Sequence, residues 1–223
     1  MRYRGATMTL REVIERPLLR GHIHLACALV APFALGVLLV VAQTPAAYVS
    51  ATIFGLGLIL LFSVSAAYHL IPWPPRAHPI ARRIDQSTIF LAIGASYTPF
   101  CVHALAPTWG IPILVTVWTL CLAGVALKVT WPGAPVWLGV GSYLVVGWVA
   151  LVTIQPLSTA MSAAALGAMI IAGLLYSLGA LAYATRWPNP FPRLIGHHEV
   201  FHLLVAAASI VLYGVVALEV LPS

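Results

Sequence analysis

Seven long apolar stretches alternate with short polar or proline-containing segments along the chain. They cover residues 23–42, 47–70, 86–106, 109–129, 135–154, 159–183 and 198–220. Each stretch is long enough to form a helix that crosses a hydrocarbon core about 30 Å thick. The segments between them contain helix breakers, such as IPWPP at 71–75, WPGAP at 131–135 and QPLS at 155–158. The pattern predicts an all-α membrane protein with a seven-helix transmembrane domain over residues 23–220.

Positive charges lie on one side of the predicted bundle. Lys and Arg occur in the N-terminal arm, residues 1–22, and in or beside the second, fourth and sixth connections, whereas the other connections and the C-terminus have none. Cations concentrate in cytoplasmic segments. We therefore expect a plasma-membrane protein with its N-terminus in the cytoplasm and its C-terminus outside. Within the arm, residues 8–20 are expected to form either a short interfacial helix or a disordered segment.

A cleaved signal peptide ending near Ala42 is the alternative interpretation of the first apolar stretch. Its length of about 20 residues exceeds the usual apolar core of a signal peptide. Cleavage would also leave the second stretch without flanking cations on its outer side. We therefore expect the first stretch to remain as a transmembrane helix.

Composition excludes several classes of protein. Of the 223 residues, 61% are hydrophobic and 7% are charged, whereas soluble domains have about 25% charged residues. The net charge of +6 is not arranged as a basic stripe with interleaved aromatic residues, which excludes a nucleic-acid-binding protein. Cys27, Cys101 and Cys121 all lie inside apolar stretches and are expected to be buried free thiols. Any function must therefore reside in the helical bundle itself.

Histidines at two predicted helix ends form a candidate metal site. His198 and His202 are four residues apart and share one face of the last predicted helix. His69, at the cytoplasmic end of the second predicted helix, would provide a third imidazole, and Ser65 shares its face. Three protein ligands with an open fourth position are typical of catalytic zinc. The alternative is that these histidines only form hydrogen bonds with lipid headgroups or backbone carbonyls.

Two carboxylates lie near these histidines. Asp85 begins the third predicted helix, where it could act as an N-cap, orient a metal-associated water, or do both. The predicted topology puts it at the same cytoplasmic depth as the histidines. Glu199 lies about 100° around its helix from His198. We expect it to pair with Arg193 or another cytoplasmic cation, or to support the metal ligands.

Four segments carry a resemblance to a known family. SAAYHL (65–70), RRIDQSTIFLAIGASYTPF (82–100), GLLYSLGALAYATRWPNPFP (173–192) and GHHEVFH (196–202) resemble the haemolysin III branch of the progestin and adipoQ receptor family, which includes relatives of the adiponectin receptors. The resemblance implies a seven-helix bundle with zinc bound by His69, His198 and His202. It also implies a water held between the metal and Asp85, with Ser65 nearby.

The same constellation of residues is similar, more distantly, to that of alkaline ceramidases, which implies hydrolysis of a lipid amide. The first predicted helix departs from the family pattern, because ERPLLRGHIHLACA contains Glu15 and His24 but no Asn. We expect His24 to form interfacial hydrogen bonds rather than to bind metal.

Three functions follow from these observations. The leading one is a zinc-dependent hydrolase of lipid amide or acyl bonds, acting on membrane lipids, with a role in membrane-lipid homeostasis implied by the resemblance. The alternatives are a receptor or sensor with structural zinc and a pore-forming haemolysin. No polar stripe of the kind that a conducting pore needs runs along any predicted helix. No sequence feature indicates an oligomeric state.

Overall fold

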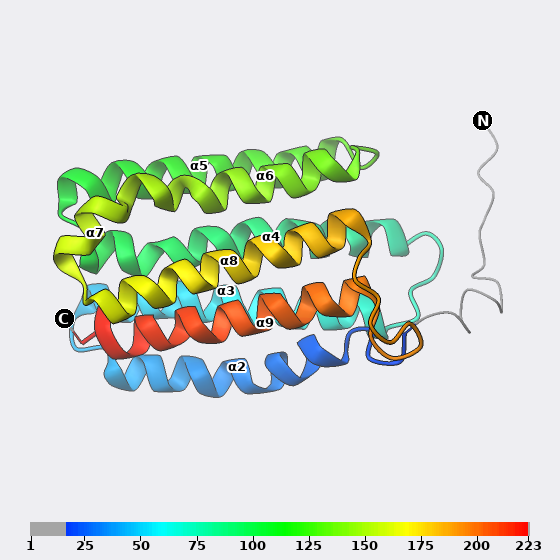
Figure 1. Ribbon diagram of the computed structural model, residues 1–223, viewed down its shortest axis with the longest axis horizontal. Helices are drawn as coiled ribbons and strands as arrows, with labels where there is room; N and C mark the ends of the chain where they lie inside the picture. Colours follow the sequence, from blue (N-terminus) through cyan, green and yellow to red (C-terminus); the bar gives the residue numbers. More distant parts are fainter. Residues whose placement is uncertain (1–16, 223) are drawn as a thin grey trace.

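The computed structural model describes residues 17–222 and is helical, without β-strands, over that part of the chain. Glu15 and most of the predicted interfacial helix over 8–20 lie outside these residues. The helices, drawn in Figure 1, are α2 (His22–Val41), α3 (Pro45–Leu70), α4 (His78–Pro99), α5 (Pro107–Thr130), α6 (Val136–Trp148), α7 (Ile154–Ala160), α8 (Ala163–Thr185) and α9 (His197–Val215). Short π-helical segments, Phe100–Ala104 and Val216–Val220, extend α4 and α9. A 3₁₀ segment, Val149–Thr153, joins α6 to α7.

Local sequence explains where several helices begin. Thr44 caps α3 by accepting a hydrogen bond from the Ala47 N–H, and Ser162 caps α8 by accepting one from the Ala165 N–H. Proline occupies the first or second position of α3, α4 and α5. Proline suits these positions because the first N–H groups of a helix have no partner within it. The breaker residues of the sequence therefore often start a helix directly.

Two boundaries differ from the sequence-based expectation. Helix α4 begins at His78 rather than at residue 86, so Asp85 lies in its second turn and is not an N-cap. Helix α7 includes residues 155–158, which were expected to form a connection. Pro156 lies just after the 3₁₀ segment that joins α6 to α7, and the helical path that begins at Val136 continues past it to Ala160. The chain turns later, at Met161 and Ser162.

Six of the described helical segments are long and apolar enough to cross a membrane. They are His22–Val41, Pro45–Leu70, Pro107–Thr130, Val136–Ala160, Ala163–Thr185 and His197–Val220. Helix α4 is of similar length but is not one of the six, and its first half carries charged residues. Large apolar side chains point outward, as shown by Phe33, which is 78% exposed, and Val40, which is 85% exposed. Such a surface needs a lipid environment, so the chain is an integral membrane protein.

The helices lie side by side and alternate in direction. Helices α2, α4 and α9 begin at the end of the bundle where α3 and α8 finish, and the C-terminus lies at the opposite end (Figure 1). We call the first of these the histidine end, because it contains His69 and His198. Helix α2 packs against both α3 and α9. It therefore lies against both helices that carry the histidines.

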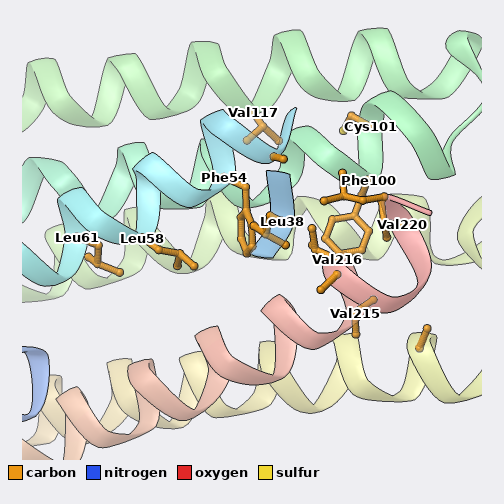
Figure 2. Close-up of a cluster of buried hydrophobic side chains, with 14 of the residues drawn as sticks. Leu38, Phe54, Leu58, Leu61, Phe100, Cys101, Val117, Val215, Val216 and Val220 are labelled. Carbon is orange, nitrogen blue, oxygen red and sulfur yellow. The ribbon is translucent and has the colours of Figure 1, made fainter. Parts of the chain in front are cut away.

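Apolar side chains fill the bundle beyond the histidine end. Figure 2 shows Leu38 of α2 and Phe54 of α3 meeting Phe100 and Val216 from the two π-helical segments. All four side chains are at most 5% exposed. This core sets the mutual positions of α2, α3, α4 and α9, and so the positions of the polar side chains at the histidine end.

Candidate metal centre

Three imidazoles from two helices that are distant in sequence come together at the histidine end. His69 lies in the last turn of α3, and His198 and His202 lie in the first two turns of α9. The Nε2 atoms of His69 and His198 are 3.1 Å apart. One nitrogen from each of the three residues lies within 4.8 Å of the other two. His69 and His202 are buried, and His198 is half-buried.

The donor set suits a zinc ion. Zinc binds imidazole nitrogen at about 2.0–2.1 Å, so tetrahedral ligands are separated by roughly 3.3 Å. The separation between His69 and His198 is close to that value. Nδ1 of His202 is buried without a hydrogen-bond partner among the described residues. A buried polar atom left in this way needs an explanation, and a bound ion is one. The three histidines could therefore hold a metal ion.

Gly21 allows α2 to start against one of these histidines. It has a φ of 84°, in the left-handed region that favours glycine, and a Cβ added to it would lie 2.7 Å from Cβ of His69. Any other residue would meet both a backbone and a packing penalty. Gly21 therefore allows the start of α2 to pack directly against His69.

A buried ion pair ties the N-terminal segment to the metal-site helix. Nε of Arg20 contacts Oε1 of Glu199, whose side chain is fully buried between the positions of His198 and His202 in the sequence. The other oxygen of Glu199 accepts a hydrogen bond of 2.9 Å from the Gly196 N–H. The expected cationic partner therefore exists, but it is Arg20 and not Arg193.

His24 lies at the site, contrary to the expectation of an interfacial position. It is 2% exposed, and its ring stacks on that of His202 with 3.9 Å between centroids. Neither of its ring nitrogens has a hydrogen-bond partner among the described residues. It is not a member of the group of three possible ligands. An ionisable residue inside a predicted span is by default a candidate functional residue. This rule could have identified His24 from the sequence.

Ser65 and Asp85 face the same interior space as the histidines. Both residues line a cavity that is also lined by His198 and His202. Ser65 is 3% exposed, and its side chain is close enough to interact with the Asp85 carboxylate as a hydrogen-bond donor. Asp85 does not belong to the group of three close ligands. The three histidines thus come together, and Ser65 and Asp85 share a cavity with two of them.

The cavity is large and mostly apolar. It has a volume of about 450 Å³ and is lined by side chains from each of the helices α2 to α9. Arg82 and Lys128 line it at the histidine end, and Leu105 and Leu157 line it farther away. Small-molecule sites usually have volumes of about 300–1,000 Å³ and apolar walls with a few polar groups. The cavity can therefore accept the hydrocarbon chain of an amphiphile.

His103, the remaining histidine of a predicted span, lies elsewhere in the bundle. Nε2 of His103 is 2.8 Å from the hydroxyl of Ser50, so the two side chains are hydrogen-bonded.

Tyr183 contacts the ring of His198, with centroids 5.3 Å apart. The three cysteines are free, and Cys101 and Cys121 are buried.

Comparisons with known proteins find similar sequences over most of the chain. A family model described as haemolysin-III related matches residues 13–213, a range that includes all three histidines. The chain is 34% identical over 166 residues to a hemolysin-3 homolog of Bacillus subtilis (strain 168), covering 74% of each protein. It is 29% identical over 181 residues to hemolysin-3 of Bacillus cereus, covering 81% of this chain and 79% of that one. A stretch of 58 residues is 48% identical to an adiponectin receptor protein of Drosophila melanogaster, covering 24% of this chain and 13% of the receptor.

Proposed function

Because the chain belongs to the haemolysin III branch of the progestin and adipoQ receptor family, we propose that it is a zinc-dependent membrane hydrolase of lipid amide or acyl bonds. Its physiological role would be in the homeostasis of membrane lipids. One observation carries the proposal: His198, His202 and Asp85 all line a single apolar cavity inside a membrane bundle. A metal site open to such a cavity can meet a lipid, and a closed structural site cannot.

The proposal includes a topology. Helix α4 would be a seventh span, together with the six apolar segments. Its arginines would lie at the cytoplasmic surface, because cations favour that side. The histidine end would then face the cytoplasm, with the N-terminus inside, the C-terminus outside and the plasma membrane as the location.

The residues of the site have complementary chemical roles in this mechanism. His69, His198 and His202 would hold zinc, which when bound supplies Lewis-acid chemistry that polarises a carbonyl and activates water. The carboxylate of Asp85 would orient the attacking water and accept its proton. Ser65 would hold Asp85 in position by donating a hydrogen bond to it. The protonated carboxyl group could then return the proton to the leaving amine or alcohol.

The cavity determines which substrates fit. Its apolar lining would hold the acyl chain of a lipid and keep bulk water from the scissile bond. A lipid would enter laterally from the bilayer, because its chain need never leave an apolar environment. Membrane lipids are therefore the proposed substrates.

Metal analysis tests the first half of the proposal. Protein purified in detergent should contain about one zinc per chain. Separate substitutions of His69, His198 and His202 by Ala should each remove most of it. His103→Ala is the matched control, because His103 is hydrogen-bonded to Ser50 and is not in the group of close histidines. Full zinc retention in all three variants would refute the proposed centre.

Lipid turnover tests the second half. Vesicles that contain a ceramide and the reconstituted protein should release fatty acid, measured by mass spectrometry. Asp85→Asn should lower the rate by about 10²–10⁴-fold while zinc is retained, because it removes the proton acceptor. Equal rates for the two proteins, with zinc present in both, would exclude this role of Asp85.

A sensor with structural zinc is the second candidate function. The ligands come from α3 and α9, so a bound ion would link two helices that are distant in sequence. In that case, removal of zinc should lower the thermal unfolding temperature, and the protein should release no fatty acid above the background of empty vesicles.

A further inference from the structure

A lysine of the last turn of α5 points into the cavity instead of toward water. Lys128 is only 9% exposed, and it lines the cavity. A lysine near the end of a membrane helix usually extends its ammonium group to the interface. Burial of an ammonium group is costly unless an anion or a dipole compensates it. Lys128 therefore needs a partner.

No carboxylate of residues 17–222 forms an ion pair with Lys128, since the ion pair of these residues joins Arg20 to Glu199. The ammonium group instead lies over the ring of Tyr143, whose centroid is 5.2 Å away. A cation–π contact compensates only part of the loss of hydration. The ammonium group thus retains unused capacity to donate hydrogen bonds.

Gly139 on α6 makes room for the ammonium group. A Cβ added to Gly139 would lie 2.3 Å from Nζ of Lys128. Gly141, two residues later, has nothing within 4 Å of such a Cβ. The position of the ammonium group therefore depends on a specific glycine, which offers a way to displace it without altering its charge.

A second cation faces the same space. Arg82 of α4 lines the cavity and interacts electrostatically with both Lys128 and Asp85. Asp85 follows Arg82 by three residues, so the two side chains share one face of α4. The groups that face Lys128 are thus Arg82 and the ring of Tyr143, and Asp85 lies beside Arg82 on the same face of α4. Two cations against one carboxylate leave an excess of positive charge at this end of an otherwise apolar cavity.

We propose that Lys128 and Arg82 bind the anionic headgroup, a carboxylate or a phosphate, of a lipid whose hydrocarbon chain lies in the cavity. The apolar walls beyond the two cations favour an amphiphile over a free anion. That this lipid is a substrate or a product rests on the proposed function, but the binding site itself does not. The subsite would confer a preference for acidic lipids over neutral ones of equal chain length.

A binding competition tests the site. The full chain with His202→Ala is used in a neutral detergent at pH 8, so that a bound metal cannot hold the headgroup. A fluorescent single-chain probe is displaced with hexadecanoic acid, hexadecyl phosphate or hexadecanol. The two acids should bind about tenfold more tightly than the alcohol, which is the size of one charge-assisted hydrogen bond. Lys128→Met should abolish this preference without changing the affinity for the alcohol.

Four further variants keep the test informative. Lys128→Arg retains the charge and should retain the preference. Gly139→Ala should weaken acid binding because its Cβ displaces the ammonium group, whereas Gly141→Ala should not. Arg193→Met removes an exposed cation that does not line the cavity, and it should change nothing. Thermal unfolding of each variant verifies that it is folded.

Two results would overturn the proposal. One is an unchanged preference for acids in folded Lys128→Met. The other is displacement of hexadecyl phosphate by sodium phosphate at equal concentration, which would identify a free-anion site. The assay is also independent of turnover, which is measured on the unaltered protein: a preference for acids in the binding assay, together with no hydrolysis by the unaltered protein, would preserve the subsite and refute the hydrolase. Hydrolysis without that preference would refute the subsite and leave the hydrolase in place.

Discussion

The ion pair between Arg20 and Glu199 provides a direct test of how the N-terminal segment stabilises the site. The perturbation is Arg20→Met, which keeps much of the side-chain volume but leaves the Glu199 carboxylate buried and without its cation. Removal of one partner from a buried pair costs about 3–5 kcal/mol. Because the side chain of Arg20 is 21% exposed, water compensates in part. We therefore expect the lower limit, about 3 kcal/mol.

The complementary variant, Glu199→Gln, should have a smaller effect. The amide oxygen of glutamine can still accept the hydrogen bond from the Gly196 N–H, and the neutral side chain leaves no buried charge. We expect a cost of about 1 kcal/mol. The double variant should resemble Glu199→Gln alone, because neither charge is then buried without its partner.

Thermal unfolding in detergent measures these effects. A maleimide dye that reacts with Cys101 and Cys121 reports unfolding, because both thiols are buried in the folded protein. For a chain of this size, 1 kcal/mol shifts the unfolding midpoint by about 2–4 °C. Arg20→Met should therefore lower the midpoint by about 6–12 °C, and Glu199→Gln by about 2–4 °C. A shift below about 2 °C for Arg20→Met, or additive shifts in the double variant, would refute the inferred pair.

Three further predictions concern single contacts, two of them at the site and one elsewhere in the bundle. Gly21→Ala should lower the unfolding midpoint by several degrees, because φ is 84° there and the new Cβ meets Cβ of His69; an unchanged midpoint would contradict this packing. His24→Phe should keep the ring stacking on His202, remove two unpaired nitrogens and raise the midpoint; loss of zinc from this variant would instead show that His24 binds the metal. Ser50→Ala should cost about 1 kcal/mol by removing the hydrogen bond to His103, and its zinc content should equal that of the unaltered protein.

Local sequence patterns were sufficient for the helices and for the candidate ligands. The hydrophobic stretches predicted six segments that the structure shows as long apolar helices, because a membrane helix satisfies its backbone within one continuous segment. The four-residue spacing of His198 and His202 predicted a shared face, because side chains one turn apart lie above one another. The approach of His69 to this pair followed from assigning both helix ends to the same side of the membrane.

Helix ends depended on more than the hydrophobic pattern. Helix α4 extends to His78 through a charged segment, so Asp85 became part of a helix instead of its cap. Apolar periodicity does not detect such a segment, because its polar residues lie beyond the apolar stretch. The proline at 156 was expected to end a helix, but the helical path continues past it to Ala160.

Tertiary structure alone decided the contacts that Arg20 and Lys128 make inside the bundle. Nothing in the sequence near Arg20 identifies Glu199 as its partner, and nothing near Lys128 indicates a cavity. These contacts depend on which helices are neighbours and on how far each is rotated about its axis. Hydrophobicity determines the length of a helix and its location in the membrane, but it is nearly indifferent to that rotation when a helix is apolar on all sides. The rotation of each helix is determined instead by close packing among side chains distant in sequence, such as Phe54 and Phe100. This packing positions the groups at the histidine end.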